Sequence, residues 1–201
     1  ACHNGALPPI RPSGPEYGFM LGDDFYVAPI HQDSLTRTVT LPAGRWRYLF
    51  KDDEVIQGPT TLTRDFPMNE LPVYIRDGAV VPMNIERDYT GIGQKDWAGH
   101  VTYNLYPTEQ TNAFELVHPD GSGKTSVGCG LYNGGKELRI YVDGVKKPHI
   151  LRARVEKKPA AVTLDGTSLA EGTAWQYDLA SHRLIVRTEN YETGKYLVSF
   201  P

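Results

Sequence analysis

The sequence predicts an all-β protein with two antiparallel β-sandwich domains in tandem. Three observations favour this class: apolar residues alternate with polar ones in short runs, turn dipeptides such as Asp77-Gly78 and Asp143-Gly144 end these runs, and no apolar period near 3.6 residues persists for three turns. Many short strands at close spacing are typical of sandwiches. The 201 residues suffice for one large or two small domains.

The first series of predicted strands runs from residue 19 to residue 85. The apolar run at 25–30 indicates a strand that is buried on both faces. The alternating runs 37–41 and 45–50 flank Pro42-Ala43-Gly44, a tight-turn sequence, and are therefore predicted to form a hairpin. Further strands are expected at 60–63, 71–76 and 79–81. The last two are expected to pair across the Asp77-Gly78 turn.

A second series follows an irregular connection. Strands are expected at 101–105, 114–117, 138–142, 150–155, 162–164, 183–187 and 196–200. The predicted organisation is a lead-in over 1–18, a first domain over 19–85, a connection over 86–99 and a second domain over 100–201.

Charge and composition disfavour several function classes. The formal charge is −3, with 21 basic and 24 acidic residues and no basic stripe, so a nucleic-acid partner is not expected. No apolar run approaches the length of a membrane span, so a membrane partner is not expected either. The six histidines lack metal-ligand spacing, and neither a metal nor another cofactor is predicted. Cys2 and Cys129 are compatible with a disulfide or with two free thiols, which leaves the compartment undetermined.

One glycine-rich stretch imitates a phosphate-binding loop. Residues 121–126, Gly-Ser-Gly-Lys-Thr-Ser, resemble the end of a P-loop, but the position of its first glycine is occupied by His118. A helix should follow to help hold the anion, and Val127-Gly128-Cys129-Gly130 is a poor helix start. A hairpin loop is therefore the preferred interpretation.

Two carboxylates, Glu70 and Asp77, lie near each other in the sequence and raise the question of hydrolase chemistry. On one predicted strand their backbones would lie about 20 Å apart, at roughly 3.3 Å per residue. Glycosidase carboxylates need separations of about 5 to 9.5 Å. The two are therefore predicted to be a strand entrance and a turn aspartate, unless the strand folds back between them.

Aromatic side chains are the candidate carbohydrate-binding residues, because a flat apolar ring can stack on a sugar. Trp46 sits in a regular alternation and is expected in the core. Trp97 and Tyr89 lie in the irregular connection and are the predicted sugar contacts. Asp23-Asp24 alone is too few oxygen ligands for a calcium prediction.

Three segments together resemble glycoside hydrolase family 31, the α-glucosidase and α-xylosidase family. They are FMLGDDFYVAPI (19–30), RTVTLPAGRWRYLF (37–50) and ELPVYIRDGAVVPM (70–83). In that family, similar segments follow the catalytic barrel in this order and build the proximal C-terminal β-sandwich. ALPPIRP (6–12) resembles the end of the barrel, and residues 100–201 are similar in strand rhythm to the distal C-terminal sandwich. The resemblance implies a fragment that lacks the catalytic (β/α)8 barrel.

The resemblance also bears on FPMNE, residues 66–70. The family's nucleophile lies in a barrel motif resembling Trp-x-Asp-Met-Asn-Glu, and Pro67 stands where the nucleophilic aspartate would be. A (β/α)8 barrel needs roughly 250 residues with alternating helices, so the chain cannot contain one. No catalytic residue is therefore expected in this chain.

The expected function is the non-catalytic C-terminal part of a retaining α-glycoside hydrolase, which would pack against the barrel of the same polypeptide and stabilise it. The first residue is Ala1 and no signal peptide is visible, which agrees with a fragment or a processed chain. An oligosaccharide is a second candidate partner. The alternatives are a free-standing carbohydrate-binding sandwich and a receptor or adhesion sandwich without a sugar ligand.

Overall fold

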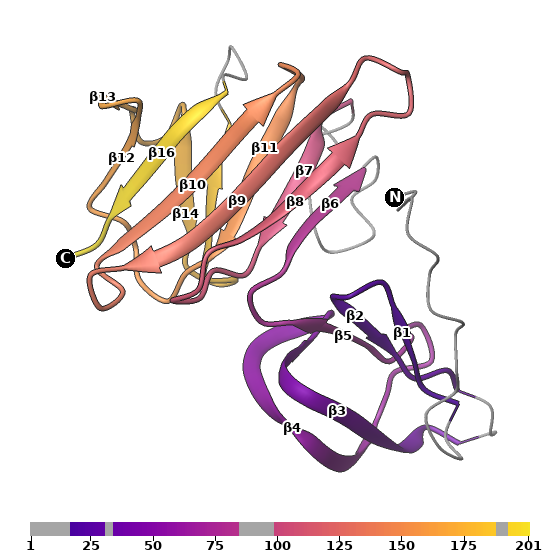
Figure 1. Ribbon diagram of the computed structural model, residues 1–201. Helices are drawn as coiled ribbons and strands as arrows, with labels where there is room; N and C mark the ends of the chain where they lie inside the picture. Colours follow the sequence, from indigo (N-terminus) through magenta and orange to yellow (C-terminus); the bar gives the residue numbers. More distant parts are fainter. Residues whose placement is uncertain (1–16, 31–33, 85–98, 188–192) are drawn as a thin grey trace. The chain divides into compact units, whose positions relative to one another are not determined.

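The computed structural model describes residues 17–30, 34–84, 99–187 and 193–201 (Figure 1). Every regular element in these ranges is a β-strand, which confirms the predicted all-β class. The chain divides between Asp77 and Gly78 into two compact units, and each unit has its own hydrophobic core.

The first unit contains one five-stranded antiparallel sheet in the order β1-β2-β5-β3-β4. Its strands are β1 (Phe19–Leu21), β2 (Phe25–Val27), β3 (Thr36–Tyr48), β4 (Lys51–Asp65) and β5 (Val73–Arg76). β3 and β4 form a long ribbon that curls over in Figure 1. Phe66 follows one end of this ribbon and packs at 5.7 Å against Tyr48 at the other end. The ribbon therefore wraps around the core of the unit.

The core of the first unit is rich in aromatic residues. Trp46 is fully buried, its indole Nε1 donates to the carbonyl oxygen of Pro42 at 2.9 Å, and its ring lies 6.2 Å from that of Tyr26. Val39 and Leu41 are also fully buried, as their alternation in the sequence predicts. The expectation that Trp46 belongs to the core is therefore confirmed.

The predicted hairpin across Pro42-Ala43-Gly44 is wrong. Runs 37–41 and 45–50 do not pair, because β3 continues through this segment and β4 is its partner. The register shifts between Leu41 and Gly44, and Gly44 has a φ of +132°. Proline and glycine suit a bulge as well as a turn, so the composition alone does not distinguish the two.

The second unit is a sandwich of two sheets. One has the order β13-β12-β16-β10-β9-β8 and the other β14-β15-β11-β7-β6. Its strands are β6 (Val80–Asn84), β7 (Val101–Leu105), β8 (Asn112–Val117), β9 (Lys124–Tyr132), β10 (Glu137–Gly144), β11 (His149–Arg154), β12 (Ala161–Leu164), β13 (Thr167–Ser168), β14 (Trp175–Asp178), β15 (Arg183–Val186) and β16 (Gly194–Ser199).

Both sheets contribute to the sandwich core. Leu138, Ile140 and Val142 of β10 are buried, and they pack with residues of the opposite sheet such as Leu151 and Leu184. The predicted alternation in this strand is thus confirmed. All but one of the described strand pairs are antiparallel; β11 and β7 run parallel.

The pairing predicted for residues 79–81 is wrong. These residues do not return along β5, because β6 pairs with β7 through partners such as Val80 with Leu105. β6 therefore belongs to the second unit, although the sequence places it in the first domain. The Asp77-Gly78 turn does end β5, as expected, but it leads into the next unit instead of a hairpin.

Candidate functional site

The predicted sugar contacts, Trp97 and Tyr89, lie outside the described residues. The other two tryptophans are poor sugar platforms, because Trp46 is fully buried and Trp175 is 5% exposed. The indole of Trp175 donates to the carbonyl oxygen of Leu169 at 2.9 Å. Both rings are therefore parts of a hydrophobic core.

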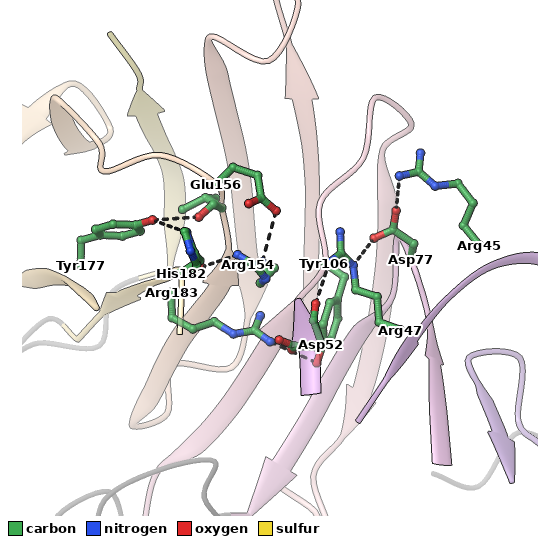
Figure 2. A network of polar contacts seen from close by, with 11 residues as sticks. Arg45, Arg47, Asp52, Asp77, Tyr106, Arg154, Glu156, Tyr177, His182 and Arg183 are labelled. Carbon is green, nitrogen blue, oxygen red and sulfur yellow. Dashed lines mark hydrogen bonds and ion pairs between the residues drawn. The ribbon is translucent and has the colours of Figure 1, made fainter. Parts of the chain in front are cut away.

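Asp77 is a buried carboxylate of the first unit that forms ion pairs with two arginines. Its side chain is 3% exposed and accepts from Arg47 Nε at 2.8 Å and from Arg45 Nη2 at 2.9 Å (Figure 2). Arg45 and Arg47 lie two residues apart on β3, so both reach the same face of the sheet. Arg47 also donates to the carbonyl oxygen of Asp52 at 2.7 Å. A buried carboxylate between two guanidinium groups has a structural function here, because both of its oxygens are occupied.

Glu70 lies on the other face of the same sheet. Its carboxylate accepts a hydrogen bond from the Tyr48 hydroxyl at 2.6 Å. Tyr48 follows Arg47 directly in β3, and successive side chains of a strand point to opposite faces. Glu70 and Asp77 therefore do not face each other and cannot act as a glycosidase pair. Burial, and then the bond to Glu70, raise the pKa of Tyr48 well above its ordinary value.

An arginine covers the aromatic rings beside Glu70. The guanidinium carbon of Arg64 lies 4.2 Å from the centre of the Tyr48 ring, 5.0 Å from that of Phe66 and 5.5 Å from that of Tyr74. Cation–π contacts of this kind stabilise the aromatic cluster. They also hold the Arg64 guanidinium against the rings. Burial raises the pKa of Tyr74 to about 12, although the nearby Arg64 opposes this shift.

The glycine-rich stretch at 121–126 is part of a hairpin, as predicted. β8 and β9 pair from Val117 with Lys124, and the intervening residues form the turn. Lys124 forms an ion pair with Glu115 at 2.6 Å. Thr125 donates to the carbonyl oxygen of Val145 at 2.9 Å and contacts His118 Nε2 at 2.8 Å. The lysine and the threonine of the imitated motif therefore have structural contacts.

A polar network ties β11, β14 and β15 of the second unit together. The Tyr177 hydroxyl donates to the carbonyl oxygen of Val155 at 3.2 Å and lies 3.2 Å from His182 Nδ1 (Figure 2). Arg154 donates to the carbonyl oxygen of His182 at 3.4 Å and forms an ion pair with Glu156 at 3.3 Å. These contacts fix the β14–β15 turn, where His182 has a φ of +51°. Sequence analysis missed this network, because β14 was not predicted.

Other site types find little support in the described ranges. These ranges contain no group of three or more His, Cys, Asp or Glu side chains that could hold a metal ion. In the same part of the chain no helix is long and apolar enough to cross a membrane. Cys129 is 1% exposed and forms no disulfide with another described residue, and burial raises the pKa of its thiol to about 12. A protonated, inaccessible thiol is a poor nucleophile.

Comparison with known proteins finds a family match to the first unit. Residues 13–81 match the model of the glycosyl hydrolase family 31 C-terminal domain. The isomaltosyltransferase of Sporosarcina globispora is 25% identical over 175 residues, which cover 80% of this chain and 16% of that protein. The α-glucosidase of Saccharolobus solfataricus is 35% identical over 65 residues, which cover 32% of this chain and 9% of that protein. The chain thus spans less than a fifth of the length of these curated relatives.

Solved structures show the same fold for both units. A Flavobacterium johnsoniae GH31 dextranase matches with a TM-score of 0.75 at 20% identity, over 91% of this chain and 26% of that chain. The cycloalternan-forming enzyme from Listeria monocytogenes matches with a TM-score of 0.76 at 21% identity, over 90% of this chain and 18% of that chain.

Proposed function

We propose that this chain, whose residues 13–81 match the model of the glycosyl hydrolase family 31 C-terminal domain, is the non-catalytic C-terminal part of a retaining α-glycoside hydrolase. Its function would be structural: it would pack against the catalytic barrel of the same polypeptide and stabilise it. The family match is the observation that carries this proposal, because it covers most of the first unit and names a C-terminal domain.

The contacts of Asp77 and Glu70 support a non-catalytic function. Retaining glycosidases use two carboxyl groups about 5 to 5.5 Å apart, one as the nucleophile and one as the general acid. Asp77 is bound by two arginines on one face of its sheet, and Glu70 is bound by Tyr48 on the other face. Neither can attack a sugar without losing contacts that hold the first unit together.

Exposed apolar side chains support the packing function. Among the described residues, ten large hydrophobic side chains are exposed, and seven of them lie in the first unit although it is the smaller of the two. They are Tyr17, Leu21, Ile30, Leu35, Phe50, Met68 and Leu71. The other three are Val117, Leu179 and Leu197 in the second unit. These side chains supply apolar area that packing against another domain would remove from water.

The isolated chain is expected to show no hydrolysis of aryl α-glycosides. The reaction needs a nucleophile and an acid on opposite sides of the glycosidic bond, and the proposal places both in the barrel. The measurement is the release of the aryl group over a range of chain concentrations, with a commercial α-glucosidase as the positive control. Release that rises in proportion to the chain, and survives repurification, would contradict a non-catalytic function.

A further inference from the structure

We propose that the loop from residue 67 to residue 72, named the docking loop, anchors the first unit on the catalytic barrel through the side chain of Met68. This inference rests on the proposed function and adds the residue that makes the contact. The expected partner is an apolar pocket on the barrel surface that receives one methionine side chain.

The exposure of Met68 is the first observation. Its side chain is 88% exposed, more than any other large hydrophobic residue in the described ranges. Leu71 in the same loop is 47% exposed. Leu35, whose carbonyl oxygen accepts from the amide of Phe66 just before the loop, is 53% exposed. The docking loop thus exposes a second apolar side chain besides that of Met68.

The contacts that hold the docking loop in place are the second observation. Phe66 precedes it and is 1% exposed, which fixes the loop to the core. Inside the loop, the amide of Glu70 donates to the carbonyl oxygen of Pro67 at 2.9 Å, and the Glu70 carboxylate accepts from Tyr48. At its end the carbonyl oxygen of Pro72 accepts from the amide of Ala28 at 2.9 Å. Two prolines further restrict the backbone.

A rigid loop that presents an apolar side chain is suited to binding. Ordering a flexible loop costs free energy when a complex forms, and a loop that is already ordered avoids this cost. Methionine is adaptable in shape and is common at binding surfaces. Transfer of the exposed Met68 side chain from water into an apolar pocket would be favourable.

The partner is expected to be the barrel of the same polypeptide because of what lies outside this chain. The matched relatives are several times longer than the chain, which spans 16% and 9% of the two curated proteins. The matched domain is named as C-terminal in its family, so a catalytic barrel is expected before it. A neighbouring domain in one polypeptide is present at high effective concentration, which favours a small apolar contact.

The test compares Met68→Asp with Leu179→Asp in two backgrounds, the full-length polypeptide and the 201-residue chain. Leu179 is the matched control, because it is 73% exposed, apolar and located in a turn of the second unit. In the 201-residue chain both changes are expected to alter the Tm by no more than about 2 °C, as exposed substitutions usually do. In the full-length polypeptide, Met68→Asp is expected to shorten the thermal-inactivation half-life by about tenfold or more, because a buried methionine side chain is lost from the contact.

Met68→Leu provides a positive control, because leucine keeps the volume and the apolar character. It is expected to retain the wild-type half-life in the full-length polypeptide. A folded yield that is lost with Met68→Asp but not with Leu179→Asp would support the proposal equally. Equal half-lives of Met68→Asp and Leu179→Asp would overturn the docking loop but leave the proposed function intact. The proposed function would fail separately, if the native polypeptide proved no longer than this chain.

Discussion

Replacing Asp77 with alanine is expected to destabilise the first unit by about 3–5 kcal/mol, the cost typical of removing one partner from a buried ion pair. The Arg47 side chain is 10% exposed, so its charge would lose its carboxylate without gaining much water. Small domains have a total stability of about 5–15 kcal/mol, and much of it would disappear. Urea unfolding measures the loss, and hydrogen exchange of β3 peptides assigns it to the first unit.

The matched control for Asp77→Ala is Glu115→Ala in the second unit. Glu115 also forms an ion pair, but its side chain is 56% exposed and that of its partner Lys124 is 60% exposed. Exposed pairs contribute about 0–1 kcal/mol, so this variant should unfold almost like the wild type. Equal destabilisation by the two substitutions would contradict the structural function assigned to Asp77.

Replacing Gly58 with alanine is expected to destabilise the first unit by about 2–3 kcal/mol or more, as overpacking at a rigid site does. A Cβ atom at this position would overlap the carbonyl oxygen of Pro42 in the neighbouring strand. That oxygen also accepts the indole hydrogen bond of the buried Trp46. Strand β4 would have to move away from β3, which would disturb the core. The fall in Tm of the first unit is the quantity to measure.

Gly22→Ala is the control for Gly58→Ala. Gly22 has a φ of +65°, and nothing lies within 4 Å of the position of an added Cβ. Its replacement should cost only the strain of a left-handed backbone, about 1–2 kcal/mol. If Gly58→Ala proved no more harmful than Gly22→Ala, the close approach of β3 and β4 at the bulge would be wrong.

Local alternation predicts the second unit well and the first unit less well. In β10, three alternating apolar residues face a continuous core, so the pattern is enough to find the strand. In β3, a proline and a glycine that look like a turn form a bulge, and the strand continues. β9 was missed because Gly128 and Gly130 interrupt its pattern. A Cβ at Gly128 would crowd Ala113 on the neighbouring strand. The glycine is therefore explained by the close approach of two strands, which the sequence alone does not reveal.

The assignment of β6 to the second unit could not be predicted from the sequence either. β6 and β5 are separated by a turn dipeptide, and a hairpin is the simplest expectation. β6 instead pairs with β7, a choice that depends on tertiary contacts. The sequence predicted that Glu70 and Asp77 lie far apart along one strand, whereas the structure separates them by placing their contacts on opposite faces of the sheet. Trp97 and Tyr89, the predicted sugar contacts, stay untested predictions.

The size of the native polypeptide tests the central proposal most directly. It can be measured by immunoblot of source extract with an antibody raised against this chain of 22.4 kDa. A catalytic barrel of roughly 250 residues would add enough mass to give at least about 50 kDa. A band well above that mass is the predicted result, and it would place the catalytic carboxylates upstream. A band near the size of the chain itself would contradict the proposal and favour the free-standing carbohydrate-binding sandwich.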